Sequence, residues 1–493
     1  MAVIAAFAIA LHARTLSFGF SYLDDDALIL EQQPVLSQPA SVWRAFGRPY
    51  FPSAGRDHAY YRPLVAASFA LDALRTGADP RGYRVTNLLL HALAAALLFA
   101  WLRRLGTGDG VAFFGGAVLA LHPALTEAVA WIPGRNDSLL TVFALGSWLA
   151  LLRARDGRGW PARVLHLVLW LAALFTKETA VVLPVAFLAH GWLLERRRGR
   201  ALVEPWLAAG WVAAAGVYVA ARVAAVSAGT DVVGAGGLSL AALGAALRGT
   251  PSLLAGSLGK LALPVHLSVL AVPEDTWRWP GVVTAAVLAA AFFVPGVSRV
   301  RLAFAAVCFV AFLAPSLPAS NLIVLENRLY LPALGVILAV CELARAAPVP
   351  ARAKTITAVG VLAVLATTAF AYAGNFRDRL TFSEAAVRGS PHSSLAHRNL
   401  GVAYHVAGDV ARARAQYDAA LAEDAGEPVA HNNLAVILMA QGDLAEAERH
   451  LRQELSINPA YAPAHHNLAL VLRARGRPTE ADVAEAKARA LTP

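Results

Sequence analysis

The sequence predicts an all-α protein in which a polytopic membrane helix bundle precedes an α-solenoid of short helical repeats. Of the 493 residues, 57% are hydrophobic and 15% are charged, whereas soluble domains carry roughly 25% charged residues. Apolar runs approaching the roughly 20 residues that a membrane-spanning helix needs recur from Met1 to Tyr372 and then stop. We therefore expect a membrane domain at 1–373, a linker at 374–393 and a repeat domain at 394–493.

Basic loops set the expected direction of the spans, because Lys and Arg residues in short loops remain in the cytoplasm. Placing all five basic loops there requires about eleven spans, with a long outer loop at 18–82 and the C-terminus on the other side. The loops are Arg103–Arg104, Arg153–Arg163, Arg196–Arg200, Arg299–Arg301 and Arg345–Lys354. The spans are expected near 1–17, 83–102, 111–131, 138–152, 163–176, 179–194, 202–227, 280–298, 301–317, 329–345 and 355–373.

Two stretches fit this count less simply. Residues 163–194 must cross twice, so their helices should be short or should meet at Thr176–Glu178 below the outer surface. Residues 251–271 are apolar enough to span, but a span there would turn Arg299 and Arg301 outward. We therefore expect a re-entrant or interfacial helix at 251–271. In the outer loop, Ser41–Phe46 and Leu64–Leu74 are expected to form amphipathic helices on the membrane face.

The charge pattern argues against a nucleic-acid-binding protein, and the cysteine content argues against a disulfide framework or a cysteine metal site. The net charge is +10, but Lys and Arg gather at the ends of apolar runs, which indicates membrane orientation rather than nucleic-acid binding. Cys308 and Cys341 lie in apolar segments and have no disulfide or metal-site pattern. Residues Met1–Leu11 lack a basic n-region and a cleavage site, so we expect a retained first span.

The C-terminal part is a repeat with a period of 34 residues. Small residues where two helices touch and Gly in the turn between them are typical of tetratricopeptide repeats. We expect three repeats, at 394–427, 428–461 and 462–493, whose inner face binds an extended peptide or another partner. One His per repeat is interpreted as a packing choice, because metal ligands must converge. The recurring residues are Asn399, Asn433 and Asn467; Gly408, Gly442 and Gly476; Ala413, Ala447 and Ala481; and His397, His431 and His465.

Ionisable residues gather at the outer ends of the predicted spans, around the acidic triplet Asp24, Asp25 and Asp26. A triplet alone is compatible with a solvated flank, but an intramembrane charge costs at least roughly 2.5 kcal/mol unless it is paired or hydrated. Fourteen such residues at one depth therefore predict a polar cavity that opens outward. The others are Arg62, His91, His122, Glu127, Arg135, Asp137, Lys177, Glu178, Arg222, Glu326 and Arg328.

Each of these residues also has a structural interpretation. Arg135 and Asp137 could form a loop ion pair, and Lys177 and Glu178 could be turn residues. A buried histidine, such as His91 or His122, is more often a satisfied core residue than a ligand. Only the common depth of these groups favours a functional site.

Short motifs follow one another along the chain before the repeats: Tyr22–Ile29, Tyr61–Leu64, Asn87–His91, Leu121–Ala130 with Gly134–Asp137, Thr176–Glu178, and Glu326–Pro332, which includes Tyr330. In this order, and followed by the repeats, they resemble the transmembrane and tetratricopeptide-repeat O-mannosyltransferase family and its bacterial relatives. The resemblance implies the class C glycosyltransferase fold, a polyprenyl-phosphate sugar as donor, and a catalytic acid in the first outer loop. It also implies that the family's paired acids match Asp24 and Asp25, and that a metal is mostly not required.

The residue types suit such a transfer on chemical grounds. Inversion at the anomeric carbon needs a carboxylate that takes the acceptor's hydroxyl proton, and cations that hold the leaving phosphate. The acidic triplet supplies the first, and Lys177, Arg222 and Arg328 are the candidates for the second. Adjacent carboxylates repel, which raises one pKa toward the range of a general base. Since no second acid at nucleophile spacing is apparent, we expect inversion.

The leading hypothesis is a glycosyltransferase of the cytoplasmic (inner) membrane that moves a sugar, with mannose as one candidate, to an acceptor protein or glycan on the outer face. The repeats would lie on the periplasmic or outer side and recruit the acceptor, and membrane lipid would surround the bundle. A divalent cation at the acidic triplet stays open. The same cavity would suit a transporter or flippase of lipid-linked sugars, although inverted repeats are not apparent. A non-catalytic anchor for a repeat scaffold is the third alternative.

Overall fold

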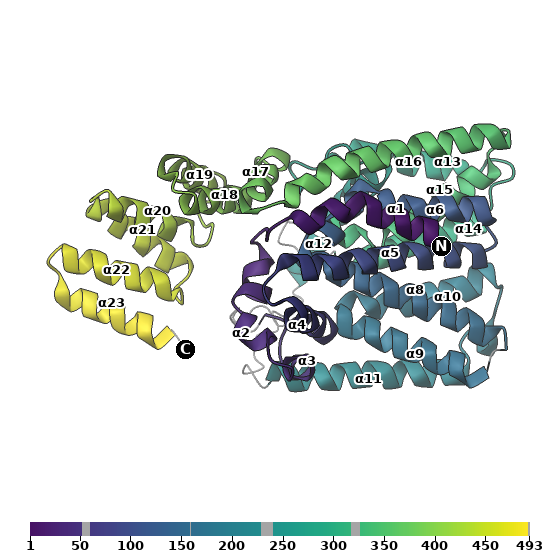
Figure 1. Ribbon diagram of the computed structural model, residues 1–493, viewed down its shortest axis with the longest axis horizontal. Coiled ribbons are helices and arrows are strands. Elements are labelled where there is room, and N and C mark those ends of the chain that lie inside the picture. Colours follow the sequence, from purple (N-terminus) through teal and green to yellow (C-terminus); the bar gives the residue numbers. More distant parts are fainter. Residues whose placement is uncertain (52–59, 158, 228–239, 317–325, 492–493) are drawn as a thin grey trace. The chain divides into compact units, whose positions relative to one another are not determined.

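The computed structural model describes residues 1–51, 60–157, 159–227, 240–316 and 326–491. Every regular element in these ranges is a helix, which confirms the all-α prediction (Figure 1). The chain forms two compact units: one contains residues 1–267 and 276–378, and the other contains residues 268–275 and 379–493.

The first unit is a bundle in which each predicted span corresponds to a helix or a group of short helices. The single helices are α5 (Pro80–Arg104), α8 (Arg135–Arg155), α9 (Gly159–Thr176), α11 (Pro205–Ser227), α13 (Trp279–Ala291), α14 (Arg299–Leu313), α15 (Ala333–Ala346) and α16 (Ala351–Ala373). The composite elements are α1 (Ala2–His12) with η1 (Ala13–Ser17); α6 (Asp109–Leu121) with η4 (Pro123–Leu125) and α7 (Glu127–Ala130); and η6 (Glu178–Val182) with α10 (Leu183–Ala189) and η7 (His190–Leu194).

Six helices in the described ranges are long and apolar enough to cross a membrane, and a bent pair makes a possible seventh. The bent pair is Asp109–Leu121 with Pro123–Ala130, which turns by 56°. Pro123 lacks an N–H, and the Nδ1 atom of His122 accepts a hydrogen bond from the backbone of Ala124, so the chain restarts as a new helix there. The protein is a multi-pass membrane protein, and the number of eleven spans stays a prediction.

Close helix contacts in the bundle depend on glycine at defined positions. A Cβ atom at Gly281 would lie 1.7 Å from the carbonyl oxygen of Ala255, so glycine is needed where α12 (Leu240–Ala262) meets α13. A Cβ atom at Gly335 would lie 2.5 Å from the carbonyl oxygen of Ala305, where α15 meets α14. Helix α12 covers the first part of the ambiguous stretch 251–271, and the re-entrant or interfacial helix expected there stays a prediction.

The outer loop forms short helices at one end of the bundle (Figure 1). The predicted amphipathic segments are helical, as α3 (Ser41–Arg44) with η3 (Ala45–Gly47) and as α4 (Pro63–Thr76), and α2 (Gln33–Leu36) precedes them. Phe20, Ile29 and Phe69 form part of a separate apolar cluster under this loop. The described part of the loop is therefore a packed subdomain that holds its charged residues in place.

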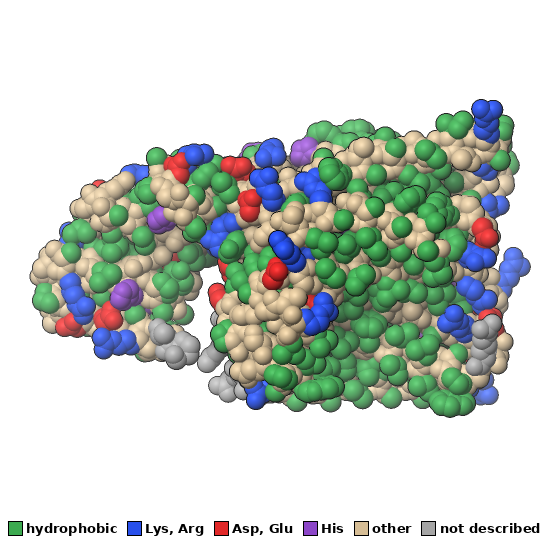
Figure 2. Space-filling model, viewed as in Figure 1, with side chains coloured by type: hydrophobic (Ala, Val, Ile, Leu, Met, Phe, Trp, Pro, Cys, Tyr) green, Lys and Arg blue, Asp and Glu red, His purple; other side chains and the backbone are tan. Residues whose placement is uncertain are grey.

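The basic loops gather at the opposite end of the bundle, where Figure 2 shows Lys and Arg side chains beyond a broad hydrophobic surface. Arg104 pairs with Asp156, and Arg155 pairs with Glu195 at 2.8 Å. The Nη2 atom of Arg301 donates to the carbonyl of Leu105 at 2.8 Å. These contacts join loops that the charge pattern placed on one side of the membrane.

The second unit contains the three predicted repeats, each a pair of helices. Gly408, Gly442 and Gly476 have φ of 81°, 82° and 73°, so each takes the left-handed conformation that ends the first helix of its pair. The helices are α18 (Ser394–Val406), α19 (Val410–Glu423), α20 (Ala430–Ala440), α21 (Leu444–Ile457), α22 (Ala462–Ala474) and α23 (Pro478–Leu491). The predicted linker contains α17 (Arg379–Gly389), which belongs to this unit.

The repeated histidines have a structural role. The Nε2 atom of His397 donates to the carbonyl of Pro391 at 2.9 Å, and that of His465 donates to the carbonyl of Pro459 at 2.9 Å. His431 makes the corresponding bond to Ala425. Each histidine therefore binds the carbonyl six residues earlier, in the segment that enters its repeat.

The gathering of the basic loops predicts that they and the repeats lie on opposite sides of the membrane. Cysteine placed at Val406 (71% exposed) should react with a membrane-impermeant maleimide on intact cells, and cysteine at Trp160 (73% exposed) should react only after permeabilisation. The unmodified protein is the control, since Cys308 and Cys341 are buried. The reverse labelling pattern would overturn the orientation.

Candidate functional site

The acid loop, which we define as Gly19–Asp26, holds Asp25 in a fixed position. Asp25 is fully buried, and its Oδ2 atom accepts hydrogen bonds from the Ser21 backbone (2.8 Å), the Ser21 hydroxyl (2.9 Å) and the Tyr22 backbone (3.2 Å). Tyr22 has φ of 65°, a conformation that costs roughly 1–2 kcal/mol outside glycine. Such strain is typical of segments that a surrounding structure holds for function.

Asp24 is in a different environment from its neighbour. Its side chain is partly exposed, and it makes no hydrogen bond or ion pair with any residue in the described ranges. Burial and the neighbouring charge of Asp25 raise the pKa of Asp24 to about 6, although Arg62 opposes the shift. Asp24 therefore has the accessibility and the proton affinity that suit a general base. Asp26 begins the π-helical turn η2 (Asp26–Leu30) that follows.

Arg62 connects the acid loop with the turn between α9 and η6. It precedes Pro63 at the start of α4, and its guanidinium binds Glu178 through two nitrogen atoms, at 3.1 to 3.3 Å. The rings of Tyr50 and Tyr60 lie 5.3 and 4.6 Å from the guanidinium carbon. This cation is therefore held by a bidentate ion pair and two aromatic rings.

The neighbouring residue, Lys177, pairs in another direction. Its Nζ atom lies 2.7 and 2.8 Å from the two carboxylate oxygens of Asp137 on α8. Asp137 also accepts a hydrogen bond from the side chain of Asn327 at 3.2 Å, and the backbone N–H of Asn327 donates to Glu127 at 3.0 Å. These contacts bring α7, α8, the α9–η6 turn and η10 (Glu326–Leu329) together.

Glu326 pairs with a cation that sequence reasoning missed. The Nζ atom of Lys260, near the end of α12, lies 3.1 Å from Oε1 of Glu326, and both side chains are buried. The hydroxyl of Tyr372 on α16 donates to Oε2 of Glu326 at 2.8 Å. A lone lysine in the apolar stretch 251–271 was a signal that could have placed this segment next to an acid.

The three predicted phosphate-binding cations differ in how they are held. Arg328 is partly exposed and makes no hydrogen bond or ion pair within the described part of the chain, and it lies close enough to Lys177 for their charges to repel. Arg222 on α11 lies 3.4 Å from the hydroxyl of Tyr218. Lys177 is committed to Asp137. Arg328 is therefore the member of this set that is most available to an anion.

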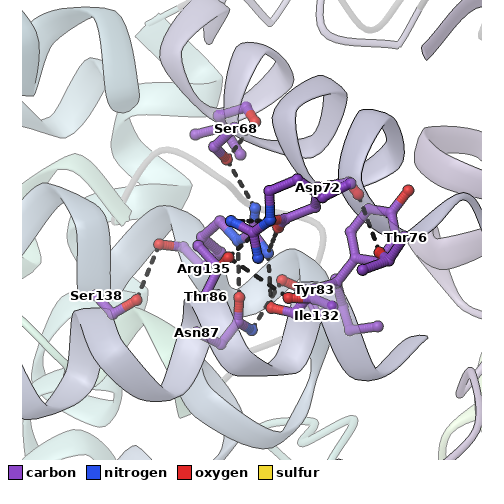
Figure 3. Close-up of polar contacts among 12 residues, drawn as sticks. Ser68, Asp72, Thr76, Tyr83, Thr86, Asn87, Ile132, Arg135 and Ser138 are labelled. Atoms are coloured by element: carbon purple, nitrogen blue, oxygen red, sulfur yellow. Dashed lines mark hydrogen bonds and ion pairs between the residues drawn. The ribbon is translucent and has the colours of Figure 1, made fainter. Parts of the chain in front are cut away.

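Arg135 has a structural role, which Figure 3 shows. Its guanidinium lies 2.6 Å from a carboxylate oxygen of Asp72, and it donates to Asn87 (2.7 Å), Ser68 (2.9 Å) and the carbonyl of Tyr83 (2.8 Å). These partners lie on α4 and α5, so Arg135 of α8 fixes the outer-loop helix to the bundle. The structural interpretation of Arg135 and Asp137 as a loop ion pair is wrong, because Arg135 pairs with Asp72 and Asp137 pairs with Lys177.

His91, His122 and Tyr330 are satisfied core residues. The Nε2 atom of His91 donates to the carbonyl of Ala120 at 3.1 Å, and its Nδ1 atom lies 2.6 Å from the hydroxyl of Tyr330. The Nε2 atom of His122 donates to the carbonyl of Leu261 at 3.0 Å. Among the described residues, no three His, Cys, Asp or Glu side chains are grouped so that they could hold a metal ion.

The structure thus defines a class: a multi-pass membrane protein with a polar cluster at one end of its bundle and three tetratricopeptide repeats. The model of the dolichyl-phosphate-mannose-protein mannosyltransferase family matches residues 57–223. The tetratricopeptide-repeat model matches residues 394–419, 428–453 and 462–484, which confirms the repeats.

Similar curated proteins are named protein O-mannosyl-transferases. Protein O-mannosyl-transferase Tmtc1 of Drosophila melanogaster is 37% identical over 179 residues, which are 36% of this chain and 21% of the relative. Protein O-mannosyl-transferase TMTC2 of Homo sapiens is 37% identical over 167 residues, which are 33% of this chain and 19% of the relative. The matches span about a fifth of these relatives and confirm the resemblance to the transmembrane and tetratricopeptide-repeat O-mannosyltransferase family.

The Arg135 contacts predict a large effect of Arg135→Met on stability. Removing one partner of a buried ion pair costs about 3–5 kcal/mol, because the other charge stays buried. Thermal unfolding of the detergent-solubilised protein should therefore shift strongly downward. Arg75→Met is the matched control, because Arg75 is an exposed partner of the same Asp72, at 3.6 Å, and an exposed pair is worth about 1 kcal/mol or less. Equal shifts in the two variants would contradict the structural role of Arg135.

Proposed function

We propose that the protein transfers a sugar, with mannose as the first candidate, from a polyprenyl phosphate to an acceptor on the outer face of the cytoplasmic membrane. The observation that carries this proposal is the placement of two available charges around one ion-pair cluster. Asp24 faces Arg62, Arg62 binds Glu178, and the adjacent Lys177 neighbours Arg328. A base and an anion-binding cation therefore border the same cluster. The resemblance to O-mannosyltransferases supports the choice of reaction.

Asp24 is the proposed general base. Its carboxylate would take the proton of the acceptor hydroxyl while the oxygen attacks the anomeric carbon and the bond to the donor phosphate breaks. Asp25 is already committed to three hydrogen bonds from Ser21 and Tyr22, so its proposed role is to order the acid loop. Asp26 would support it by beginning the turn that follows. We therefore propose inversion, with one acid acting on the acceptor.

Arg328 is the proposed ligand of the donor phosphate, and Lys177 and Arg222 would add positive charge. An Arg guanidinium suits phosphate because it donates two parallel hydrogen bonds. The phosphate becomes more negative as it leaves, so a preorganised cation stabilises the transition state. The repeats would recruit an acceptor polypeptide or glycan, in keeping with the peptide-binding surfaces of such solenoids.

Asp24→Asn should lower transfer from a purified polyprenyl-phosphate mannose by at least about a hundredfold, the usual contribution of a general base. Donor binding and thermal stability should be unchanged. In the wild-type protein, transfer should fall as pH drops through about 6, because the raised pKa of Asp24 means that the base is protonated below that value. Glu31→Gln, at an exposed acid that follows the acid loop within the outer loop, should behave as wild type. Full activity of Asp24→Asn would eliminate this residue as the base.

Arg328→Ala should weaken donor binding about tenfold to hundredfold, because a hydrogen bond to a charged group is worth about 1.5–3 kcal/mol. Titration calorimetry with a water-soluble short-chain polyprenyl phosphate measures this change directly. Arg328 has no described hydrogen-bond partner to lose, so thermal stability should change little. Arg352→Ala, at an exposed cation at the start of α16, is the matched control. Unchanged donor affinity in Arg328→Ala would count against the phosphate assignment.

A further inference from the structure

A buried arginine that the sequence patterns did not single out holds the acid loop. Arg84 lies on α5 and is 1% exposed. Its guanidinium donates to the backbone carbonyls of Ala130, Gly19 and Phe376. These carbonyls belong to three separate segments: the end of α7, the acid loop and the end of η11 (Gly374–Phe376). A buried cation is costly unless it is well hydrogen-bonded, and here one side chain joins three backbone segments.

A second contact ties the acid loop to the same place. The backbone N–H of Gly19 donates to the carbonyl of Arg377 at 2.9 Å. Gly19 is therefore held from both sides, since its own carbonyl accepts from Arg84. Two residues after Arg377, the chain enters the repeat unit at Arg379. The start of the acid loop and the segment that leads into the repeats are thus joined by direct hydrogen bonds.

Arg84 also acts on the acids by its charge. The Oδ1 atom of Asp25 is buried and has no hydrogen-bond partner among the residues that the structure describes, so nearby positive charge favours its ionised form. Burial raises the pKa of Asp25, whereas Arg84 and the hydrogen bonds from Ser21 and Tyr22 lower it. The charged and titratable groups that face the two acids are therefore Arg84 from α5, Arg62 at the start of α4, and the phenol of Tyr50.

We propose that Arg84 is a positioning residue of the transfer reaction, which holds Gly19–Asp25 against Phe376–Arg377 and so fixes where the Asp24 carboxylate meets the acceptor hydroxyl. Its guanidinium supplies the geometry through three carbonyl contacts. Its charge favours the ionised form of Asp25, which accepts the Ser21 and Tyr22 hydrogen bonds. The inference rests on the proposed function for its kinetic consequence. The ordering of the acid loop is a structural consequence that does not depend on catalysis.

The test compares Arg84→Gln, Arg84→Lys and the control Arg81→Gln, an exposed arginine three residues earlier on the same helix. Transfer from polyprenyl-phosphate mannose is measured between pH 5 and 9 with the whole 493-residue chain. Arg84→Gln should lower kcat roughly hundredfold, as a misplaced reacting group does. The acidic limb of its pH profile should move up, because Arg84 lowers the pKa of Asp25 and the ordered loop needs Asp25 in its ionised form. Arg84→Lys keeps the charge but has fewer donors, so kcat should fall without a shift of the limb.

Hydrogen exchange of residues 18–30 gives a readout that needs no activity. Amides of the acid loop should lose protection in Arg84→Gln, while Arg81→Gln and the wild-type protein should be alike. The inference would be overturned if both Arg84 variants had the kcat, the acidic limb of the pH profile and the hydrogen exchange of the wild-type protein. A second result would also overturn the inference. If the variants lost donor affinity enough to explain the whole fall in activity, while the acidic limb and the hydrogen exchange stayed unchanged, Arg84 would be a donor-binding residue. If the wild-type protein transfers no sugar, the proposed function fails, and the exchange data still decide whether Arg84 orders the loop.

Discussion

The first turn of α8 carries the contacts on which the polar end of the bundle depends. Arg135 and Asp137 lie two residues apart, so they project in different directions from one helix. Arg135 reaches α4 and α5 through Asp72 and Asn87, whereas Asp137 reaches Lys177 and Asn327. Just before this turn, a Cβ atom at Gly134 would lie 2.6 Å from the carbonyl of Glu127, so glycine lets the turn pack against α7. One turn therefore positions both the outer loop and the deeper ion pairs.

This arrangement separates charges that build the site from charges that are available to act. In an apolar bundle, an unpaired charge is expensive, and pairing recovers that cost only with good geometry. Lys177, Lys260 and Arg62 each have a carboxylate partner, and Arg84 has three carbonyls. Asp24 and Arg328 are partly exposed and have no hydrogen bond to any residue of the described ranges. The paired charges thus provide a rigid frame in which the exposed ones can bind and react.

The sequence predicted the elements better than it predicted their partners. Apolar runs and the 34-residue period located the helices and repeats, because burial in lipid and helix stacking impose those patterns directly. Partners depend on which helices become neighbours, and no local pattern contains that information. Arg135 and Asp137 looked like a pair for this reason, and Lys260 was overlooked as one cation in an apolar stretch. Asn327 was missed although it lies inside a quoted motif, since its role comes from contacts with α7 and α8.

The acid loop shows how three adjacent, chemically identical residues acquire different roles. Tyr22 turns the backbone so that the Oδ2 atom of Asp25 accepts hydrogen bonds from two backbone amides and from the Ser21 hydroxyl. This oxygen therefore has no capacity left to accept a further proton donor. Asp24 then lies beside a fixed negative charge and in a partly buried place, and both effects favour its protonated form. A solvated triplet would give each acid an ordinary proton affinity. The buried neighbour therefore does more than order the loop: it is also a cause of the raised pKa that makes Asp24 the stronger candidate for the base.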